Sequence, residues 1–217
     1  MKSVRNLSRL ALALALALGL AISTAHAFDG DAAAGAESAG LCVACHQADG
    51  SGMNIPGGES WPRLAGINPE YLYKQLQDIK AGTRQSPTMV PFVSMLSDQQ
   101  MKDLAAYYGA QPATEAKGGE EATEEQLAHG RKLAEEGDWD RYIVPCASCH
   151  GPGNKGVGGS FPGIAGQHAG YIADQLHNWQ KATRDNDPQH LMAAIAERLS
   201  DDDIQAVSAW LARQPAQ

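Results

Sequence analysis

Two short stretches of this 217-residue sequence carry its clearest chemistry. Residues 42–46 read Cys-Val-Ala-Cys-His and residues 146–150 read Cys-Ala-Ser-Cys-His, so together they contain all four cysteines. Cys-x-x-Cys-His is the attachment motif of c-type haem. The two thiols add to the haem vinyl groups, and the histidine imidazole can bind the iron. The sequence therefore predicts two covalently bound haem c groups, attached through Cys42, Cys45, Cys146 and Cys149, with His46 and His150 as iron ligands.

Other uses of paired cysteines fit this sequence less well. A thioredoxin-like redox pair needs a βαβ context, which the sequence lacks. One zinc ion held by four cysteines would require the two motifs to meet, and it would leave both histidines without a role. A pair of structural disulfides would also leave both histidines unexplained. The motif order Cys-x-x-Cys-His, present twice, therefore favours haem.

The two motifs belong to a longer internal repeat. Residues 61–66 read Trp-Pro-Arg-Leu-Ala-Gly, and residues 161–166 read Phe-Pro-Gly-Ile-Ala-Gly. The same offset of 100 pairs Tyr71 with Tyr171, whereas the haem motifs are offset by 104. Offsets that change only between matched blocks indicate short loop insertions. The chain is therefore predicted to contain two copies of one domain rather than a solenoid.

The register of the repeat also predicts the sixth ligand of each iron. Electron-transfer haems often take a methionine opposite the histidine. Met192 is the only methionine in the second copy, and it precedes Ser200 by eight residues. Met89 precedes the matching Ser97 by the same number. We therefore predict Met89 and Met192 as axial ligands. The other two methionines of this part of the first copy are assigned to packing, namely Met95 and Met101.

Two further matched pairs are candidates for contacts around the haems. Pro62 and Pro162 each follow a haem loop, where the backbone carbonyl could accept the Nδ1 proton of the iron-binding histidine. A simple turn residue is an equal alternative. Arg84 and Arg184 could pair with haem propionates, and the alternative is a solvent-exposed arginine. The remaining histidines after residue 28 have no counterpart in the first copy and are expected at the surface, namely His129, His168, His177 and His190.

Helical patterns must position these residues in both copies. Serines 97 and 200 are followed three residues later by Gln and Asp, which is the capping-box spacing at a helix start. Alternating β-branched runs are missing, and glycine clusters mark loops after each motif. The sequence therefore predicts an all-α fold with helices over residues 31–39, 69–80, 124–135 and 168–181, and two more beginning at the capping boxes.

The N-terminal segment indicates export, and the net charge bears on possible partners. Residues 1–27 combine three basic residues, an apolar run of about 13 residues and Ala-His-Ala, which is typical of a cleavable secretory signal. A bilayer span needs roughly 20 apolar residues. Removing the signal leaves 14 basic residues against 25 acidic ones, which argues against nucleic-acid partners.

We expect a first domain over 28–114 and a second over 115–217, joined by a linker over 111–125.

With these residues in place, the chain resembles the dihaem cytochromes c4, and each half resembles a class I cytochrome c. The resemblance covers residues 28–217 and rests on both haem motifs, both Pro-x-[Leu/Ile]-Ala-Gly blocks, Met89 and Met192, and both closing Leu-Ser-Asp helices. It implies an all-α fold of two tandem class I cytochrome c-like domains related by internal duplication. It also implies a periplasmic one-electron carrier that receives electrons from a cytochrome bc1-type donor and passes them toward a terminal oxidase.

The resemblance leaves several points open. A dihaem subunit of a dehydrogenase, such as a flavocytochrome, would look the same in sequence. A dihaem peroxidase is a weaker alternative, because it needs one iron with an open position and both copies carry a methionine in matching register. We expect the protein to be an electron carrier rather than an enzyme, and we expect it to be a monomer. Peripheral membrane association stays open. The first haem loop is four residues longer than the second, so the two haem pockets are expected to differ.

Overall fold

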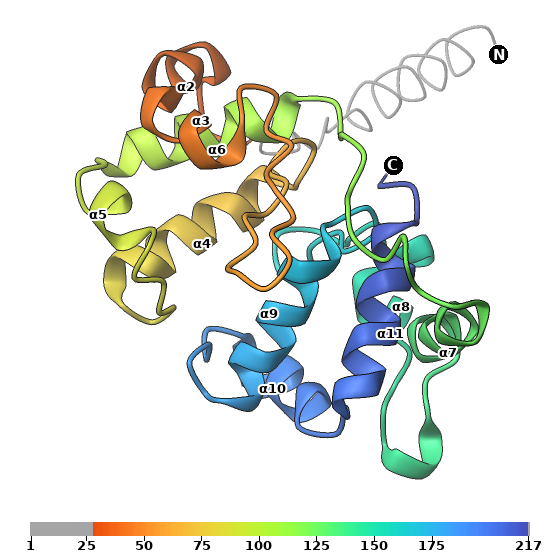
Figure 1. Cartoon of the computed structure of the whole chain (residues 1–217). Helices are drawn as coiled ribbons and strands as arrows, with labels where there is room; N and C mark the ends of the chain where they lie inside the picture. The colour runs from red at the N-terminus through yellow and green to blue at the C-terminus, as the bar shows by residue number, and fades with distance from the viewer. Residues whose placement is uncertain (1–27, 217) are drawn as a thin grey trace, which may run out of the picture.

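The structure is a computed structural model that describes residues 28–216, so the predicted signal segment 1–27 lies outside the described residues. Within this range the prediction of an all-α fold is confirmed, since backbone pairing of the β type is limited to four isolated bridges. In the described part, no helix is long and apolar enough to cross a bilayer. The chain folds as two similar halves that lie against each other, as Figure 1 shows.

The first half consists of two long helices and a set of shorter ones. Asp31 begins the first helix because its side chain accepts hydrogen bonds from the backbone N–H groups of Ala33 and Ala34. The last helix begins at Ser97, where the predicted capping box with Gln100 is present. The helical segments are α2 (Ala32–Ser38), η1 (Ala39–Leu41), α3 (Val43–His46), α4 (Pro69–Ala81), α5 (Val90–Val93) and α6 (Asp98–Ala110).

The second half repeats this order. Capping boxes at Thr123 and Ser200 begin its first and last long helices. The last helix of each half therefore begins with a serine capping box. Its segments are α7 (Glu124–Glu135), η2 (Trp139–Arg141), α8 (Ala147–His150), η3 (Pro152–Asn154), α9 (Ala169–Gln180), η4 (Pro188–His190), α10 (Leu191–Ala196) and α11 (Asp201–Ala212). The duplication inferred from the sequence is thus visible in the fold.

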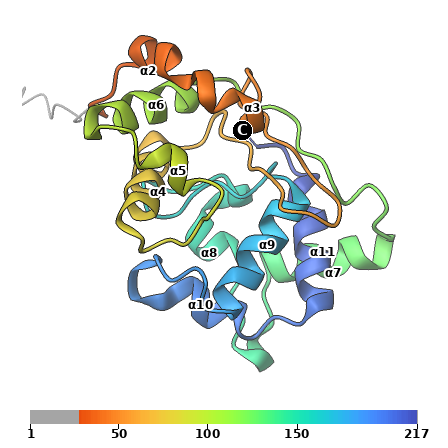
Figure 2. The ribbon, with the colours of Figure 1, turned by 60° about the vertical axis from the view of Figure 1, so that its left-hand side comes forward.

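In each half the first α-helix crosses the last one at a glycine. α2 packs on α6 and α7 packs on α11, and the two views in Figures 1 and 2 agree on both pairs. A Cβ atom on Gly35 would overlap the carbonyl oxygen of Asp103, and one on Gly130 would overlap that of Ala206. The bare glycine backbones therefore set how closely the crossing helices approach.

The segment between the halves is packed on the second half. The backbone N–H of Lys117 donates to Nδ1 of His168 over 2.9 Å, and the N–H of Ala169 donates to the Lys117 carbonyl over 3.0 Å. His168 is 2% exposed, so the prediction that it lies at the surface is wrong. It is buried because it joins the connecting segment to the first half, where its Nε2 contacts the carbonyl oxygen of Ser51 at 2.8 Å. A domain boundary near residue 115 remains our proposal.

Candidate functional site

Each cysteine motif forms a short helical turn at the wall of a cavity. The turns α3 and α8 follow Cys42 and Cys146, and they end at the buried residues His46 and His150. One helical turn brings both thiols and the imidazole of a motif to one side. All four cysteines lie in the described part, and their thiols are free. Thioether attachment of one porphyrin per motif therefore requires no disulfide to be broken.

A proline carbonyl orients each motif histidine. Nδ1 of His46 lies 2.9 Å from the carbonyl oxygen of Pro62, and Nδ1 of His150 lies 2.7 Å from that of Pro162. A carbonyl oxygen only accepts, so Nδ1 must carry the proton and Nε2 presents its lone pair. Burial lowers the pKa of both imidazoles, although the bond to the proline carbonyl partly offsets this. The neutral imidazole that results is the form that binds a metal.

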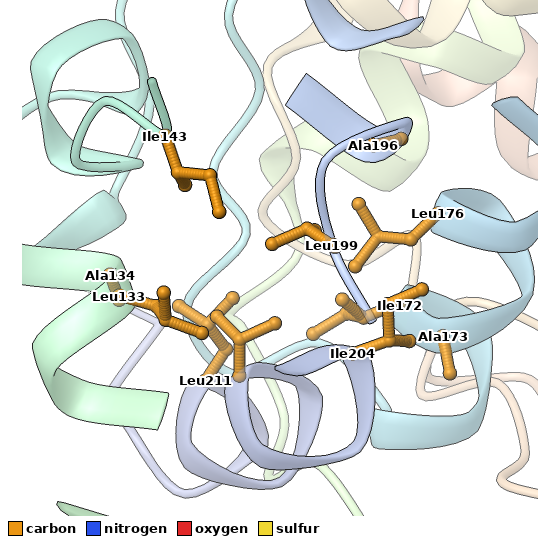
Figure 3. Close-up of a cluster of buried hydrophobic side chains, with 11 residues drawn as sticks. Leu133, Ala134, Ile143, Ile172, Ala173, Leu176, Ala196, Leu199, Ile204 and Leu211 are labelled. Atoms are coloured by element: carbon orange, nitrogen blue, oxygen red, sulfur yellow. The ribbon is translucent and has the colours of Figure 1, made fainter. Parts of the chain in front are cut away.

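The two motifs open into one continuous cavity of about 2040 Å³. Small-molecule sites usually have volumes of about 300–1,000 Å³, so this cavity has room for two large groups. Both cysteine pairs, both histidines and both predicted ligand methionines line it. Apolar side chains from α7, α9, α11 and the segments between them complete the wall in the second half. Figure 3 shows several of them facing the same space, namely Leu133, Ile143, Leu176, Leu199 and Leu211.

The predicted methionine ligands occupy matching places in the two halves. Met89 is the residue that begins α5, and Met192 lies in the first turn of α10. The carboxylate of Asp187 accepts from the backbone N–H of Met192 over 2.7 Å, which holds that turn in place. Both side chains line the cavity, and their ligand roles remain our proposal. Of the two packing methionines, Met101 is buried, whereas Met95 is 65% exposed and its assignment to packing is wrong.

Arg84 and Arg184 connect the two halves. Arg84 donates to the side chains of Tyr171 and Gln175, each over 2.9 Å. Arg184 donates in return to Tyr71 over 3.0 Å and to Gln75 over 3.2 Å. Neither arginine is solvent-exposed, because each side chain is covered by the opposite half. Both also line the cavity, so the propionate role predicted from the sequence stays open and a role between the halves is added.

Sequence reasoning missed a third arginine at this interface. Arg63 is 2% exposed, and its Nε donates to the carbonyl oxygen of Gly166 in the second half over 2.8 Å. Its backbone N–H and carbonyl oxygen both bond to the side-chain amide of Gln167, over 2.8 and 2.9 Å. Burial lowers the pKa of the Arg63 guanidinium to about 10. The sequence held one signal, because the matching residue in the otherwise conserved repeat block is Gly163.

These three arginines test whether the residues fit haem. Their hydrogen-bond partners are carbonyl, amide and hydroxyl groups, all uncharged. A buried cation without an anion is costly. All three line the cavity between the halves, so carboxylate groups entering it would be stabilised there. The cavity size, the free thiols, the oriented imidazoles and the three arginines without a hydrogen-bonded carboxylate together fit two haem groups with propionates.

The chain is similar to known proteins in sequence and in fold. The family model for cytochrome c matches residues 32–108 and 127–214. The chain is 46% identical over 173 residues to the thiosulfate dehydrogenase electron acceptor of Stutzerimonas stutzeri, covering 79% of this chain and 77% of that protein. It is 41% identical over 186 residues to cytochrome c4 of Thiocapsa roseopersicina, covering 84% of this chain and 92% of that one. The solved structure of reduced recombinant cytochrome c4 from Pseudomonas stutzeri superposes with a TM-score of 0.76 at 36% identity, covering 86% of this chain and all of the other.

Proposed function

The chain belongs to the cytochrome c family, within its dihaem cytochromes c4, and from this premise we propose that it is a periplasmic carrier passing single electrons toward a terminal oxidase. The observation that carries the proposal is the single cavity that both haem motifs share across the interface between the halves. When bound, haem iron supplies a one-electron couple between Fe(III) and Fe(II). Two such centres in one cavity would form a relay within one chain.

The residues of the chain hold and shield these centres. We propose His46 with Met89 for the first iron, and His150 with Met192 for the second. Pro62 and Pro162 fix the tautomer of each histidine through their carbonyl oxygens. Two protein ligands on each iron would leave no position for a substrate, so this ligand set would favour outer-sphere electron transfer over peroxidase chemistry. A methionine opposite histidine also raises the reduction potential, as delivery to an oxidase requires.

A cytochrome bc1-type complex is the proposed donor. Docking would be steered by charge, because the sequence has an excess of acidic residues, with 25 against 17 basic ones. The same excess disfavours binding to anionic lipid, so peripheral membrane association would have to pass through a protein partner. We propose that the chain acts as a monomer in this exchange.

A second donor is favoured by one comparison. The relative that is 46% identical is named a thiosulfate dehydrogenase electron acceptor. We propose that a thiosulfate dehydrogenase is an alternative electron donor for this chain. In that role the chain itself would oxidise no thiosulfate and would accept electrons from the enzyme.

Reconstitution of the electron path tests both donors. The holo-protein would be mixed with a bc1 complex and quinol, or with a thiosulfate dehydrogenase and thiosulfate, while haem reduction is followed optically. Reoxidation by oxidase-containing membranes would be measured in the same cuvette. Rapid reduction by one donor followed by reoxidation supports the carrier role. Peroxide turnover by the protein alone, or copurification of a tightly bound flavoprotein subunit, would contradict it.

A further inference from the structure

The second half carries a loop that the first half lacks. Cys42 follows Gly35 by seven residues, whereas Cys146 follows the equivalent Gly130 by 16. The nine extra residues lie between α7 and the second haem motif. We call residues 137–143 of this insertion the aromatic arm. In Figure 1 it projects from the second half on the side away from the first half.

The aromatic arm has a defined fold. Asp138 and Ile143 exchange two backbone hydrogen bonds, of 2.7 and 2.9 Å, which close the loop at its base. Ile143 is 1% exposed and belongs to the core, so the arm is rooted in the packed interior of the half. Between these residues the chain forms the short turn η2 and then Tyr142, with φ at +57°. A bulky residue in this left-handed region is strained.

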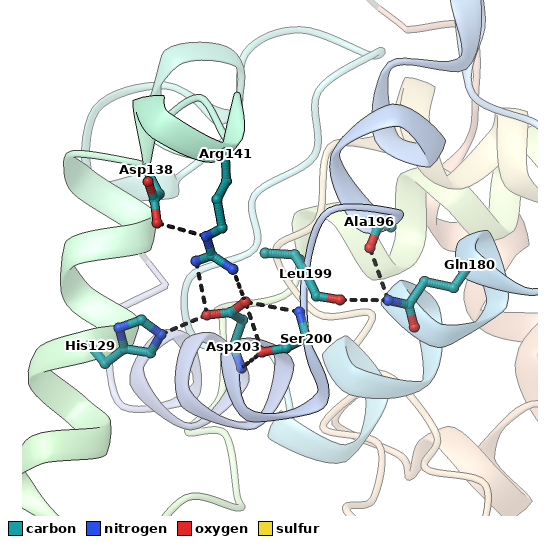
Figure 4. Close-up of polar contacts among 8 residues, drawn as sticks. All are labelled: His129, Asp138, Arg141, Gln180, Ala196, Leu199, Ser200 and Asp203. Carbon is teal, nitrogen blue, oxygen red and sulfur yellow. Dashed lines mark hydrogen bonds and ion pairs between the residues drawn. The ribbon is translucent and has the colours of Figure 1, made fainter.

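Hydrogen bonds and ion pairs among charged side chains hold the aromatic arm against α11, as Figure 4 shows. Arg141 donates from Nε to Asp138 over 2.7 Å and from Nη1 to Asp203 of α11 over 2.7 Å. Nε2 of His129 on α7 lies 2.6 Å from the same Asp203 carboxylate. Burial alone would raise the pKa of Asp203, but the bonds from Arg141, Ser200 and His129 hold it well below its usual range. The arm is thus tied to both crossing helices.

This hydrogen-bonded loop presents two aromatic side chains to solvent. Trp139 is 66% exposed and Tyr142 is 76% exposed, although they lie only three positions apart. Single exposed apolar residues are common and need no explanation. Two large exposed aromatics on one hydrogen-bonded loop differ from such single residues. Neither side chain contributes to the core, so their exposure calls for another explanation. Tryptophan and tyrosine are the residues that most often anchor protein–protein interfaces.

We propose that the aromatic arm is the docking site for a redox protein whose contact face is an apolar patch edged by lysine or arginine. The inference rests on the proposed carrier function. Two exposed carboxylates lie near the aromatics in the sequence, Glu136 before Trp139 and Asp140 after it, and neither forms an ion pair in the described part of the chain. They add to the acidic excess of the sequence. The charges therefore disfavour both an anionic membrane and a second copy of this chain as the occupant.

The arm also leads directly to an electron-transfer centre. Ile143 is followed by Val144 and Pro145, which line the cavity, and then by Cys146 of the second haem motif. A partner seated on Trp139 and Tyr142 would therefore rest on the loop that ends at this motif. One electron would leave the partner, which is oxidised, and would reduce the second centre of this chain from Fe(III) to Fe(II).

The experiment compares electron exchange with a protein probe and with a small reductant. The variant is Trp139→Ala with Tyr142→Asn, since asparagine tolerates the left-handed backbone. Met95→Ala is the matched control, because Met95 is 65% exposed in the first half. The probe is reduced lysine-rich mitochondrial cytochrome c, and the small reductant is hexaammineruthenium(II). Stopped-flow spectroscopy would give second-order rate constants for the holo-proteins at several ionic strengths.

We expect the probe reaction of the double variant to be about tenfold slower or more, since loss of an anchor residue commonly weakens an interface by this factor. The small reductant should reduce all three proteins equally, and Met95→Ala should behave as wild type with both. Equal probe rates for wild type and the double variant would overturn the docking site. Failure of the small reductant to reduce both centres reversibly would instead contradict the carrier function.

Two other occupants would be recognised in the same set of proteins. A wild-type dimer in sedimentation velocity that the double variant loses would make the arm an interface between copies of the chain. Flotation of wild type, but not the double variant, with phosphatidylglycerol vesicles would make it a membrane contact. Either result would overturn the proposal of a redox-protein docking site.

Discussion

Arg84 of the first half donates a hydrogen bond of 2.9 Å to the hydroxyl of Tyr171 in the second half. The same pair recurs in reverse, because Arg184 donates to Tyr71 over 3.0 Å. The two arginines also pair through their backbones as an isolated antiparallel bridge. Burial alone would raise the pKa of Tyr171, but the two guanidinium groups lower it. Matched residues of the two halves thus contact each other across a nearly symmetric interface.

Replacing both arginines should uncouple the two halves. In Arg84→Met/Arg184→Met, the tyrosine hydroxyls and the amide oxygen of Gln175 lose their arginine donors, whereas the amide oxygen of Gln75 keeps the one from Asn186. Each buried polar group left without a partner costs about 1–3 kcal/mol. The tyrosines are half-buried, so we expect a total loss of about 1–3 kcal/mol. Calorimetry of the holo-protein should show the single unfolding transition separate into two. Arg131→Met, at an exposed pair with Glu135, should leave the transition unchanged.

Removing either proposed methionine ligand should lower one reduction potential and leave the other near its wild-type value. Axial ligands tune haem potentials over about 0.8 V, so we expect Met89→Ala and Met192→Ala each to lower one midpoint by on the order of 0.1 V. The methionine–iron charge-transfer absorption of the ferric protein should fall by half in each variant. Redox titration and optical spectra measure both effects. Met95→Ala is the control, and an unchanged spectrum in Met192→Ala would refute the assignment.

An alanine at one helix crossing should be far more harmful than at an open glycine. A Cβ on Gly130 would meet the backbone carbonyl of Ala206, which cannot move without shifting α11, whereas a Cβ on Gly40 would have no neighbour within 4 Å. Overpacking typically costs about 1–3 kcal/mol. We expect Gly130→Ala to lose stability by this amount in denaturant titration. Gly40→Ala should change it little, and equal effects would show that the crossing is not closely packed.

His168 should make stability depend on pH below neutrality. Its Nδ1 accepts from Lys117, which only the neutral imidazole can do, and burial lowers the pKa of His168 from 6.5. A lowered histidine pKa gives a stabilisation that is full above pH 6.5 and is lost as the pH falls toward the folded-state value. The slope is at most about 1.4 kcal/mol per pH unit.

The check is a comparison of unfolding free energies for wild type and His168→Gln between pH 5 and pH 8. The variant should be less stable at pH 8 and should lose less stability on acidification. The difference between the two proteins isolates His168, since the other titrating groups are common to both. A difference that stays constant over this pH range would contradict the assignment of a neutral, buried imidazole.

Local sequence determined the chemistry of this protein and the start of its helices. The residues that attach one haem lie within five consecutive positions, such as 42–46, so their relative placement needs only one helical turn. Capping boxes at Ser97 and Ser200 act through hydrogen bonds over three residues. The repeat register then transferred each inference from one half to the other. Family membership, the all-α fold and two haem groups followed from these patterns.

Only the tertiary structure decided which polar residues are buried and what they contact. Arg63, Arg84 and His168 meet partners that lie 87 or more positions away in sequence. Such contacts depend on which surfaces of the two halves pack together. Hydrophobic periodicity predicts helices and their buried faces, but it does not predict which domain surfaces come into contact. For the same reason the sequence predicts a packing role for Met95, whereas the turn after α5 leaves its side chain exposed. The interface between the halves, and the outward aromatic arm, are properties of the folded chain.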